Sequence, residues 1–137
     1  MLLAELVLRT PNLCTLDLQT TELGDKGTRP FIDLITGQPA ALRHLYLNAN
    51  GIGQKACASL GKYLAHINCG LQSLFLSTNP IGDAGMLELV PGVAKNKTLK
   101  RLTYASAGLT SKGLSYLASA VSDRDQFNHC PVEFRIP

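Results

Sequence analysis

The chain has 137 residues, of which 45% are apolar and 17% are charged. This composition is typical of one globular domain and excludes a chain that is disordered throughout. The net charge of +3 at pH 7 comes from scattered lysines and arginines, which argues against the concentrated basic patch of a nucleic-acid-binding surface.

The chain begins with apolar side chains at helical spacing, namely Leu3, Leu6 and Val7. They predict a short helix within residues 1–12, which is either a cap or the end of a preceding repeat unit. Glu5 interrupts the apolar run, which is too short for a signal peptide or a membrane-spanning helix. The helix would leave an apolar edge uncovered. We therefore expect a piece of a longer protein or a natural short form, and the edge permits end-to-end self-association.

Four copies of one pattern follow, and each begins at a leucine: Leu13, Leu42, Leu71 and Leu99. The separations are 29, 29 and 28 residues, and each copy obeys L-x-x-L-x-[LY]-x-x-[NTA]-x-[LI]. A fixed period of this length is typical of a solenoid in which each repeat is one structural unit. The predicted repeats are residues 13–41, 42–70, 71–98 and 99–126.

Each repeat changes its periodicity halfway along. In "LYLNANGIG", residues 45–53, apolar residues first alternate as in a strand, and Asn50–Gly51 then resembles a hairpin turn. The following segment, however, places Ala56, Leu60 and Leu64 on one helical stripe. Each repeat is therefore a strand, a loop and a helix, and the stacked strands run parallel.

The end of the chain continues the pattern. Phe127, Cys130 and Val132 occupy the next L-x-x-L-x-L positions, so residues 127–137 predict a capping strand from about 129 to 136. Pro131 suits an edge strand, because proline blocks further pairing.

These repeats resemble the leucine-rich repeat of the long, ribonuclease-inhibitor-like subtype. Proteins with such repeats include the arms of NOD-like receptors, RanGAP-like proteins and tropomodulin-like actin regulators. The resemblance covers residues 13–121 and implies an α/β fold. That fold is a right-handed solenoid, shaped as a horseshoe arc, with a parallel β-sheet on the concave side and helices on the convex side. About four full repeats and two terminal caps are expected.

The outward positions of the four strands form three rows. The central row reads Asp17, Tyr46, Phe75 and Thr103, with flanking rows at Thr15, His44, Ser73 and Arg101 and at Gln19, Asn48, Ser77 and Ala105. Neighbouring parallel strands lie about 4.8 Å apart, so Tyr46 and Phe75 should be adjacent. An exposed aromatic pair with charged neighbours is typical of a protein-binding surface, although single exposed aromatics need no partner. The predicted partner-binding residues are Asp17, His44, Tyr46, Asn48, Ser73, Phe75, Arg101 and Thr103.

Asn50 and Asn79 share one position in successive repeats, where the strand turns into a loop. Backbone groups lose their strand partners at such a turn, and an asparagine amide can donate to and accept from them together. We therefore predict a structural asparagine ladder. Thr21 partly replaces the amide in the first repeat, but Ala107 cannot do so in the fourth.

No catalytic or metal-binding set is apparent in the sequence. His44, Asp17 and Ser73 resemble a triad on paper, but they lie in different rows of an open sheet without an oxyanion hole. The four cysteines, Cys14, Cys57, Cys69 and Cys130, form no CxxC pair and fit no common zinc spacing. We expect reduced thiols in a cytoplasmic protein with no metal and no cofactor.

The resulting function hypothesis is a non-enzymatic module that binds a protein or peptide on its concave β-face. It excludes nucleic acid, membrane and metal as partners. Two alternatives follow from the resemblance. One is a regulatory or autoinhibitory arm of a larger NOD-like receptor, and the other is RanGAP-like GTPase activation. An enzyme in its own right is the remaining alternative.

Overall fold

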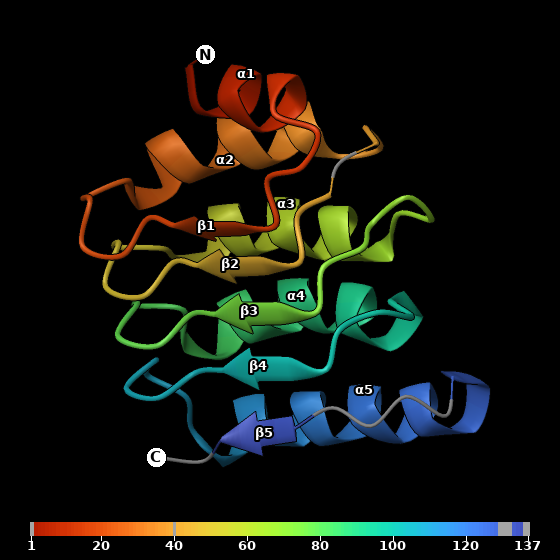
Figure 1. Cartoon of the computed structure of the whole chain (residues 1–137). Coiled ribbons are helices and arrows are strands. Elements are labelled where there is room, and N and C mark those ends of the chain that lie inside the picture. The colour runs from red at the N-terminus through yellow and green to blue at the C-terminus, as the bar shows by residue number, and fades with distance from the viewer. Residues whose placement is uncertain (1, 40, 129–132, 136–137) are drawn as a thin grey trace.

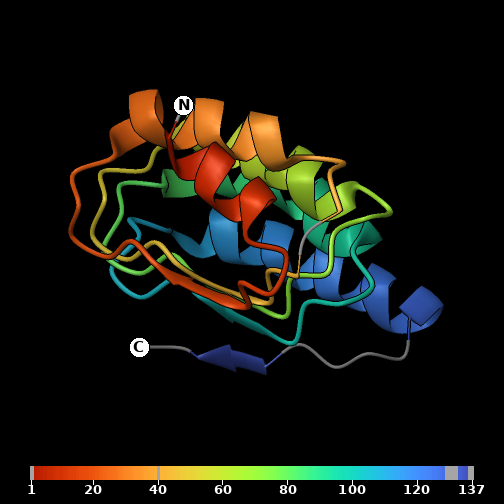
Figure 2. The ribbon, with the colours of Figure 1, turned by 45° about the horizontal axis from the view of Figure 1, so that its top comes forward.

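The computed structural model describes residues 2–39, 41–128 and 133–135. Helices and strands alternate along the chain, in this order: α1 (Leu2–Arg9), β1 (Thr15–Asp17), α2 (Gly24–Ile35), β2 (His44–Tyr46), α3 (Gln54–Ala65), β3 (Ser73–Phe75), α4 (Gly82–Lys95), β4 (Arg101–Thr103), α5 (Ser111–Asn128) and β5 (Glu133–Arg135). The strands form one parallel sheet in the order β1-β2-β3-β4-β5. The helices stack side by side behind the sheet (Figure 1). The tilted view shows a helical layer and a sheet layer, with one face of the sheet free of helices (Figure 2). The α/β solenoid expected from the repeats is confirmed.

Strand alternation places the core between the two layers. Leu45, Leu74 and Leu102, the middle residues of β2, β3 and β4, are fully buried, and they pack in one cluster with residues such as Leu60 and Leu89 of the helices. The side chains on either side of each middle residue point to the opposite face. One repeat alone could not bury its leucines, so stacking of the repeats creates the core.

The helical layer is closest where α3 passes α4. A Cβ placed on Gly92 would collide with the carbonyl oxygen of Gly61, and one on Gly61 would lie 2.6 Å from the Glu88 carbonyl oxygen. Glycine at both positions therefore lets the two helices approach at backbone distance.

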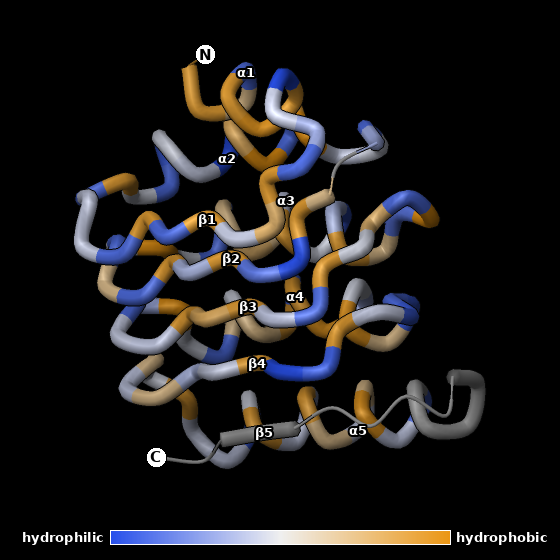
Figure 3. The backbone as a smooth tube through the Cα atoms, in the orientation of Figure 1, coloured by the Kyte–Doolittle hydropathy of each residue, from blue (hydrophilic) through white to orange (hydrophobic). Residues whose placement is uncertain are grey.

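The two ends of the solenoid differ. On α1, Ala4 and Val7 are buried and face the core, whereas Leu2 is 84% exposed and Leu6 is 50% exposed. Apolar colour accordingly dominates α1 in Figure 3. At the other end, β5 pairs with β4 in the predicted fifth strand position. The expected placement of Cys130, Pro131 and Val132 lies outside the described residues.

The sequence alignment assigned Phe127 to the start of the last strand unit, but this residue lies in α5. The helix runs for 18 residues and contains neither proline nor glycine after Gly113. Helix α4 ends at its C-cap residue Asn96, whose side chain accepts from the backbone N–H groups of Thr98 and Leu99, whereas the corresponding residue Arg124 lies within α5.

The turn after each strand has the same backbone geometry in all four repeats. Thr20, Ala49, Thr78 and Ser106 have positive φ angles of 54°, 55°, 60° and 53°. This left-handed conformation is uncommon for residues other than glycine, and it turns the strand out of the sheet toward its helix. The Asn50–Gly51 pair follows directly after this turn, and the chain continues into α3 without a hairpin.

Asn50 fills the space beneath the turn and bonds to two coils. Its Oδ1 accepts from the backbone N–H groups of Thr21 at 3.0 Å and Leu23 at 3.3 Å in the preceding coil. Its Nδ2 donates to the carbonyl oxygens of Leu18 at 2.7 Å and Leu47 at 3.2 Å. One buried amide therefore satisfies backbone groups of both coils.

Asn79 repeats the arrangement one coil later. Its Oδ1 accepts from Asn50 N at 2.8 Å and Ile52 N at 3.1 Å, and its Nδ2 donates to Leu47 O at 3.0 Å and Leu76 O at 2.9 Å. In the fourth coil the same position holds Ala107, which is buried and carries no amide.

Carboxylates join neighbouring helices in two places. Asp25 in α2 accepts from Gly53 N at 2.8 Å and Ala56 N at 3.2 Å, so it caps the N-terminus of α3 from outside that helix. Asp83 in α4 does the same for α5. Its Oδ1 accepts from Thr110 N at 2.9 Å and Gly113 N at 3.0 Å, and its Oδ2 accepts from the Thr110 hydroxyl.

Asn79→Ala is expected to lower the free energy of unfolding by about 3 kcal/mol, because it leaves the buried N–H groups of Asn50 and Ile52 without an acceptor. Urea denaturation measures the loss. The matched control is Asn12→Ala at an exposed position, which should change stability by less than about 0.5 kcal/mol. An equal loss in both variants would contradict the structural role of the ladder.

Asp83→Asn should make the stability less dependent on pH in acid. The Thr110 hydroxyl and N–H groups lower the pKa of the Asp83 carboxyl below its ordinary value of 3.8. A lowered folded-state pKa stabilises the fold above 3.8, and this stabilisation disappears as the pH falls through the lowered value. Urea midpoints should therefore differ between wild type and variant at pH 7 and converge only at a pH below the lowered folded-state pKa of Asp83. A constant difference at both pH values would show that the carboxylate charge is unimportant.

Candidate functional site

The helix-free face of the sheet, here called the open face, carries the outward side chains of the strands. At its centre the rings of Tyr46 and Phe75 stack with centroids 4.2 Å apart and planes inclined by 8°. The register sets this contact, because Tyr46 in β2 pairs directly with Phe75 in β3. Both side chains are half-buried. The adjacency expected from the repeat spacing is confirmed.

One flank of the aromatic pair is a histidine–serine contact. The His44 Nδ1 atom lies 2.9 Å from the Ser73 Oγ atom in the next strand. Ser73 was expected to be exposed on this face, but only 7% of it is accessible. The expectation was wrong because the strand pattern predicts the direction of a side chain but not which neighbouring side chains bury it. Here the His44 imidazole hydrogen-bonds to the short Ser73 side chain.

The other flank is a row of hydrogen bonds within the sheet. Asn48 Nδ2 donates to Gln19 Oε1 at 2.7 Å, and Asn48 Oδ1 accepts from Ser77 N at 2.7 Å. Ser77 Oγ in turn accepts from Ala105 N at 3.0 Å. The Asn48 amide is thus hydrogen-bonded to both neighbouring coils. Gln19 and Ser77 also have structural roles that the sequence pattern did not identify.

The remaining predicted residues lie in β1 and in β4. Asp17 is exposed at the β1 end, and its two carboxylate oxygens accept from Gln19 N at 3.0 Å and Gln19 Nε2 at 3.3 Å. Arg101 and Thr103 are half-buried in β4. The open face therefore has an exposed acid at its β1 edge and aromatic rings at the centre, whereas Arg101 of β4 is in register with the acid Glu133 of β5.

The structure does not assemble a catalytic triad. Asp17 pairs with Tyr46 and bonds to Gln19, whereas His44 contacts Ser73, so the carboxylate does not orient the imidazole. Within residues 2–39, 41–128 and 133–135, no group of three or more His, Cys, Asp or Glu side chains could hold a metal ion.

The described cysteines Cys14, Cys57 and Cys69 are free thiols. Burial raises the pKa of the Cys57 thiol to about 12, and the Asp25 and Glu88 carboxylates add to this effect. Burial also raises the pKa of Cys69. Cys14 is exposed. The two buried thiols behave as small apolar side chains and not as nucleophiles.

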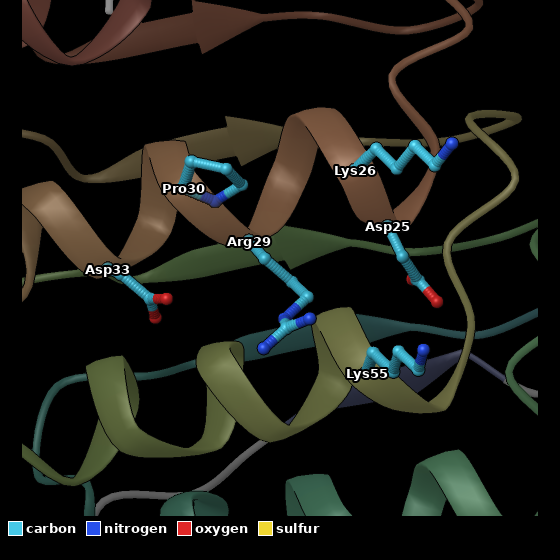
Figure 4. A pocket seen from close by; sticks show the side chains of 6 residues that line it. All are labelled: Asp25, Lys26, Arg29, Pro30, Asp33 and Lys55. Carbon is cyan, nitrogen blue, oxygen red and sulfur yellow. The ribbon is translucent and has the colours of Figure 1, made fainter.

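A second concave surface lies on the helical side, between α2 and α3. This groove has a volume of about 670 Å³, and its lining comprises Asp25, Lys26, Arg29, Pro30, Asp33 and Lys55 (Figure 4). Its charges are mixed, and Asp25 already caps α3. The groove therefore selects no single ligand chemistry.

None of the helices in the described part of the chain is both long and apolar enough to span a membrane.

Comparison with known proteins agrees with the repeat architecture. Residues 68–90 match the family described as "Leucine Rich repeat". The chain is 31% identical over 115 residues to NACHT, LRR and PYD domains-containing protein 14 of Mus musculus, covering 83% of this chain and 12% of that protein. It is 30% identical over 118 residues to the ribonuclease inhibitor of Mus musculus, covering 85% of this chain and 26% of the inhibitor. The chain thus spans only a small part of each relative's length.

A solved structure shows the same fold. The actin-binding site 2 of leiomodin-1 superposes with a TM-score of 0.81 over 98% of this chain and 78% of that chain, at 14% sequence identity. At this identity the likeness concerns the fold alone.

The exposure of the thiols predicts their order of alkylation. Iodoacetamide at pH 8 should modify Cys14 roughly 100-fold faster than Cys57, because burial and a raised pKa keep Cys57 protonated and covered. Mass mapping of quenched samples gives both rates, and the same reaction in guanidinium is the control in which the difference should vanish. Alkylation of native Cys57 as fast as Cys14 would contradict the assignment.

Proposed function

We propose that this chain, which is built of leucine-rich repeats of the ribonuclease-inhibitor-like type, is a non-enzymatic module that binds a protein or peptide on its open face. The observation that carries the proposal is the stacked pair Tyr46 and Phe75 at the centre of a sheet face that no described helix covers. Large aromatic side chains at the centre of a surface are the residue types that most often dominate protein binding.

The physical setting favours recognition by a preorganised surface. Each ring is supported by its neighbour in the stack, and the strands beneath are fixed by the parallel register on both sides. Little conformational entropy is then lost when a partner binds, which improves affinity for a given contact area. The hydrogen-bonded flanks, His44 with Ser73 and Asn48 with Gln19, hold the border of the pair in the same way.

The similar proteins support this class of function. The names of the ribonuclease inhibitor and of the leiomodin actin-binding site both refer to protein partners. The free thiols also fit a reducing compartment such as the cytoplasm.

A second candidate is a regulatory arm within a larger polypeptide. It is favoured by the similarity to NACHT, LRR and PYD domains-containing protein 14, of which the chain spans only 12%. In that case the open face would contact another domain of the same protein and not a separate partner. Determining the length of the native gene product separates the two candidates.

The double substitution Tyr46→Ala with Phe75→Ala should weaken binding of the captured partner about 30-fold or more, since loss of a central hot spot costs at least about 2 kcal/mol. Affinity capture from lysate identifies the partner, and isothermal titration calorimetry with the purified partner measures the loss.

The matched control truncates two exposed leucines on the helical side, Leu34 in α2 and Leu114 in α5, to alanine. It should bind as wild type does, and all three proteins should give folded circular dichroism spectra. Unchanged binding by the Tyr46 and Phe75 double variant, or equal loss in the leucine control, would overturn the proposed binding surface.

A further inference from the structure

The two faces of the Tyr46 ring have different neighbours. One face stacks on Phe75. The other is turned toward β1, where the residue in register is Asp17. Because neighbouring parallel strands lie about 4.8 Å apart, the Asp17 backbone is one stacking distance from the ring. Asp17 is too short to cover an aromatic ring as Phe75 does, so space for a further planar group remains above its backbone.

The Asp17 carboxylate borders this space with unused capacity. Its oxygens accept two hydrogen bonds, both from Gln19, at 3.0 Å and 3.3 Å. A carboxylate has about four acceptor positions, so two remain for a ligand. The bonds to Gln19 hold the carboxylate in place. Asp17 is exposed, and β1 is the edge strand, so the space opens to solvent and to the rim of the sheet.

The opposite end of the aromatic stack lacks these properties. The neighbour of Phe75 in register is Thr103, which has no charge and whose Oγ1 is buried without a hydrogen-bond partner among the described atoms. In the flanking row, Arg101 is in register with Glu133 of β5. A positively charged ligand group is therefore attracted to the carboxylate at the β1 end of the aromatic stack, whereas the residue in register with Phe75 at the other end offers no charge.

We propose that Asp17 and Tyr46 form a slot for an arginine side chain of the bound partner. A guanidinium is planar and can stack on the free face of Tyr46 as a third layer of the aromatic stack, while its N–H groups donate to the Asp17 carboxylate. Lysine offers the charge without the plane, and citrulline offers the plane without the charge. The inference rests on the proposed function, because it names the chemistry that the partner presents to the open face.

The experiment uses the full chain, isotope-labelled, and three probes: the N-acetyl, N-methylamide derivatives of arginine, lysine and citrulline. The Tyr46 ring resonances are followed by NMR during each titration. The arginine derivative should shift them saturably, with an affinity at least about fivefold higher than that of the lysine derivative. The citrulline derivative should cause no saturable shift. Equal binding of arginine and citrulline, or no binding of arginine, would overturn the slot.

Asp17→Asn tests the acid without removing the side chain. It should weaken binding of the arginine derivative about two- to fivefold, as loss of one charge-assisted contact at an exposed site predicts. Asp33→Asn, at an exposed acid on α2, is the matched control and should titrate as wild type does. An Asp17→Asn variant with wild-type affinity would also overturn the slot.

The two proposals fail separately. If the arginine titration fails but truncation of Tyr46 and Phe75 still abolishes partner capture, the open face binds its partner by other chemistry. If the titration succeeds but truncation leaves capture unchanged, the slot binds guanidinium, and the open face is not the partner surface.

Discussion

A buried asparagine side chain joins each central coil of this protein to the coil before it. Asn79 accepts from backbone N–H groups of the second coil and donates to carbonyl oxygens of the second and third. At Ala49 and Thr78 the strand leaves the sheet in a left-handed conformation, and the asparagine side chains give the displaced backbone groups new partners. The fourth coil makes the same turn at Ser106 with Ala107 in the asparagine position, so the buried amides stabilise the stacking of the central coils and do not create the turn.

The fixed spacing of the coils determines which side chains lie next to each other on the open face. Because successive coils are in register, residues at one repeat position line up across the sheet, and two aromatic residues one repeat apart become a stack with a centroid separation of 4.2 Å. The same alignment lets Asn48 and Ser77 bond to the coils beside them. The same regular stacking of coils therefore forms both the scaffold and the candidate binding surface.

The periodic features of this structure could be predicted from sequence, and the contacts between side chains of different repeats could not. The alternation of Leu45 and Leu47 around Tyr46 determines which residues face the core, and the repeat length places Phe75 beside Tyr46. Burial of Ser73 depends on the orientation of His44, which no spacing encodes. The caps supplied by Asp25 and Asp83 act on helices about one repeat later, so they do not resemble a local capping motif. The extension of α5 through Phe127 departs from the repeat, in which α2, α3 and α4 end earlier, so the repeat spacing alone could not predict it.

The central claim is that a partner contacts the open face and not the helical side. Cross-saturation NMR on the complex of the labelled chain with its purified partner tests this most directly, because saturation passes only to protons at the contact. The account predicts the strongest transfer to the Tyr46 and Phe75 rings, with transfer to Asp17 at the β1 edge and little to α2, α3 and α4. Strong transfer to the groove between α2 and α3, with none to the two rings, would contradict it.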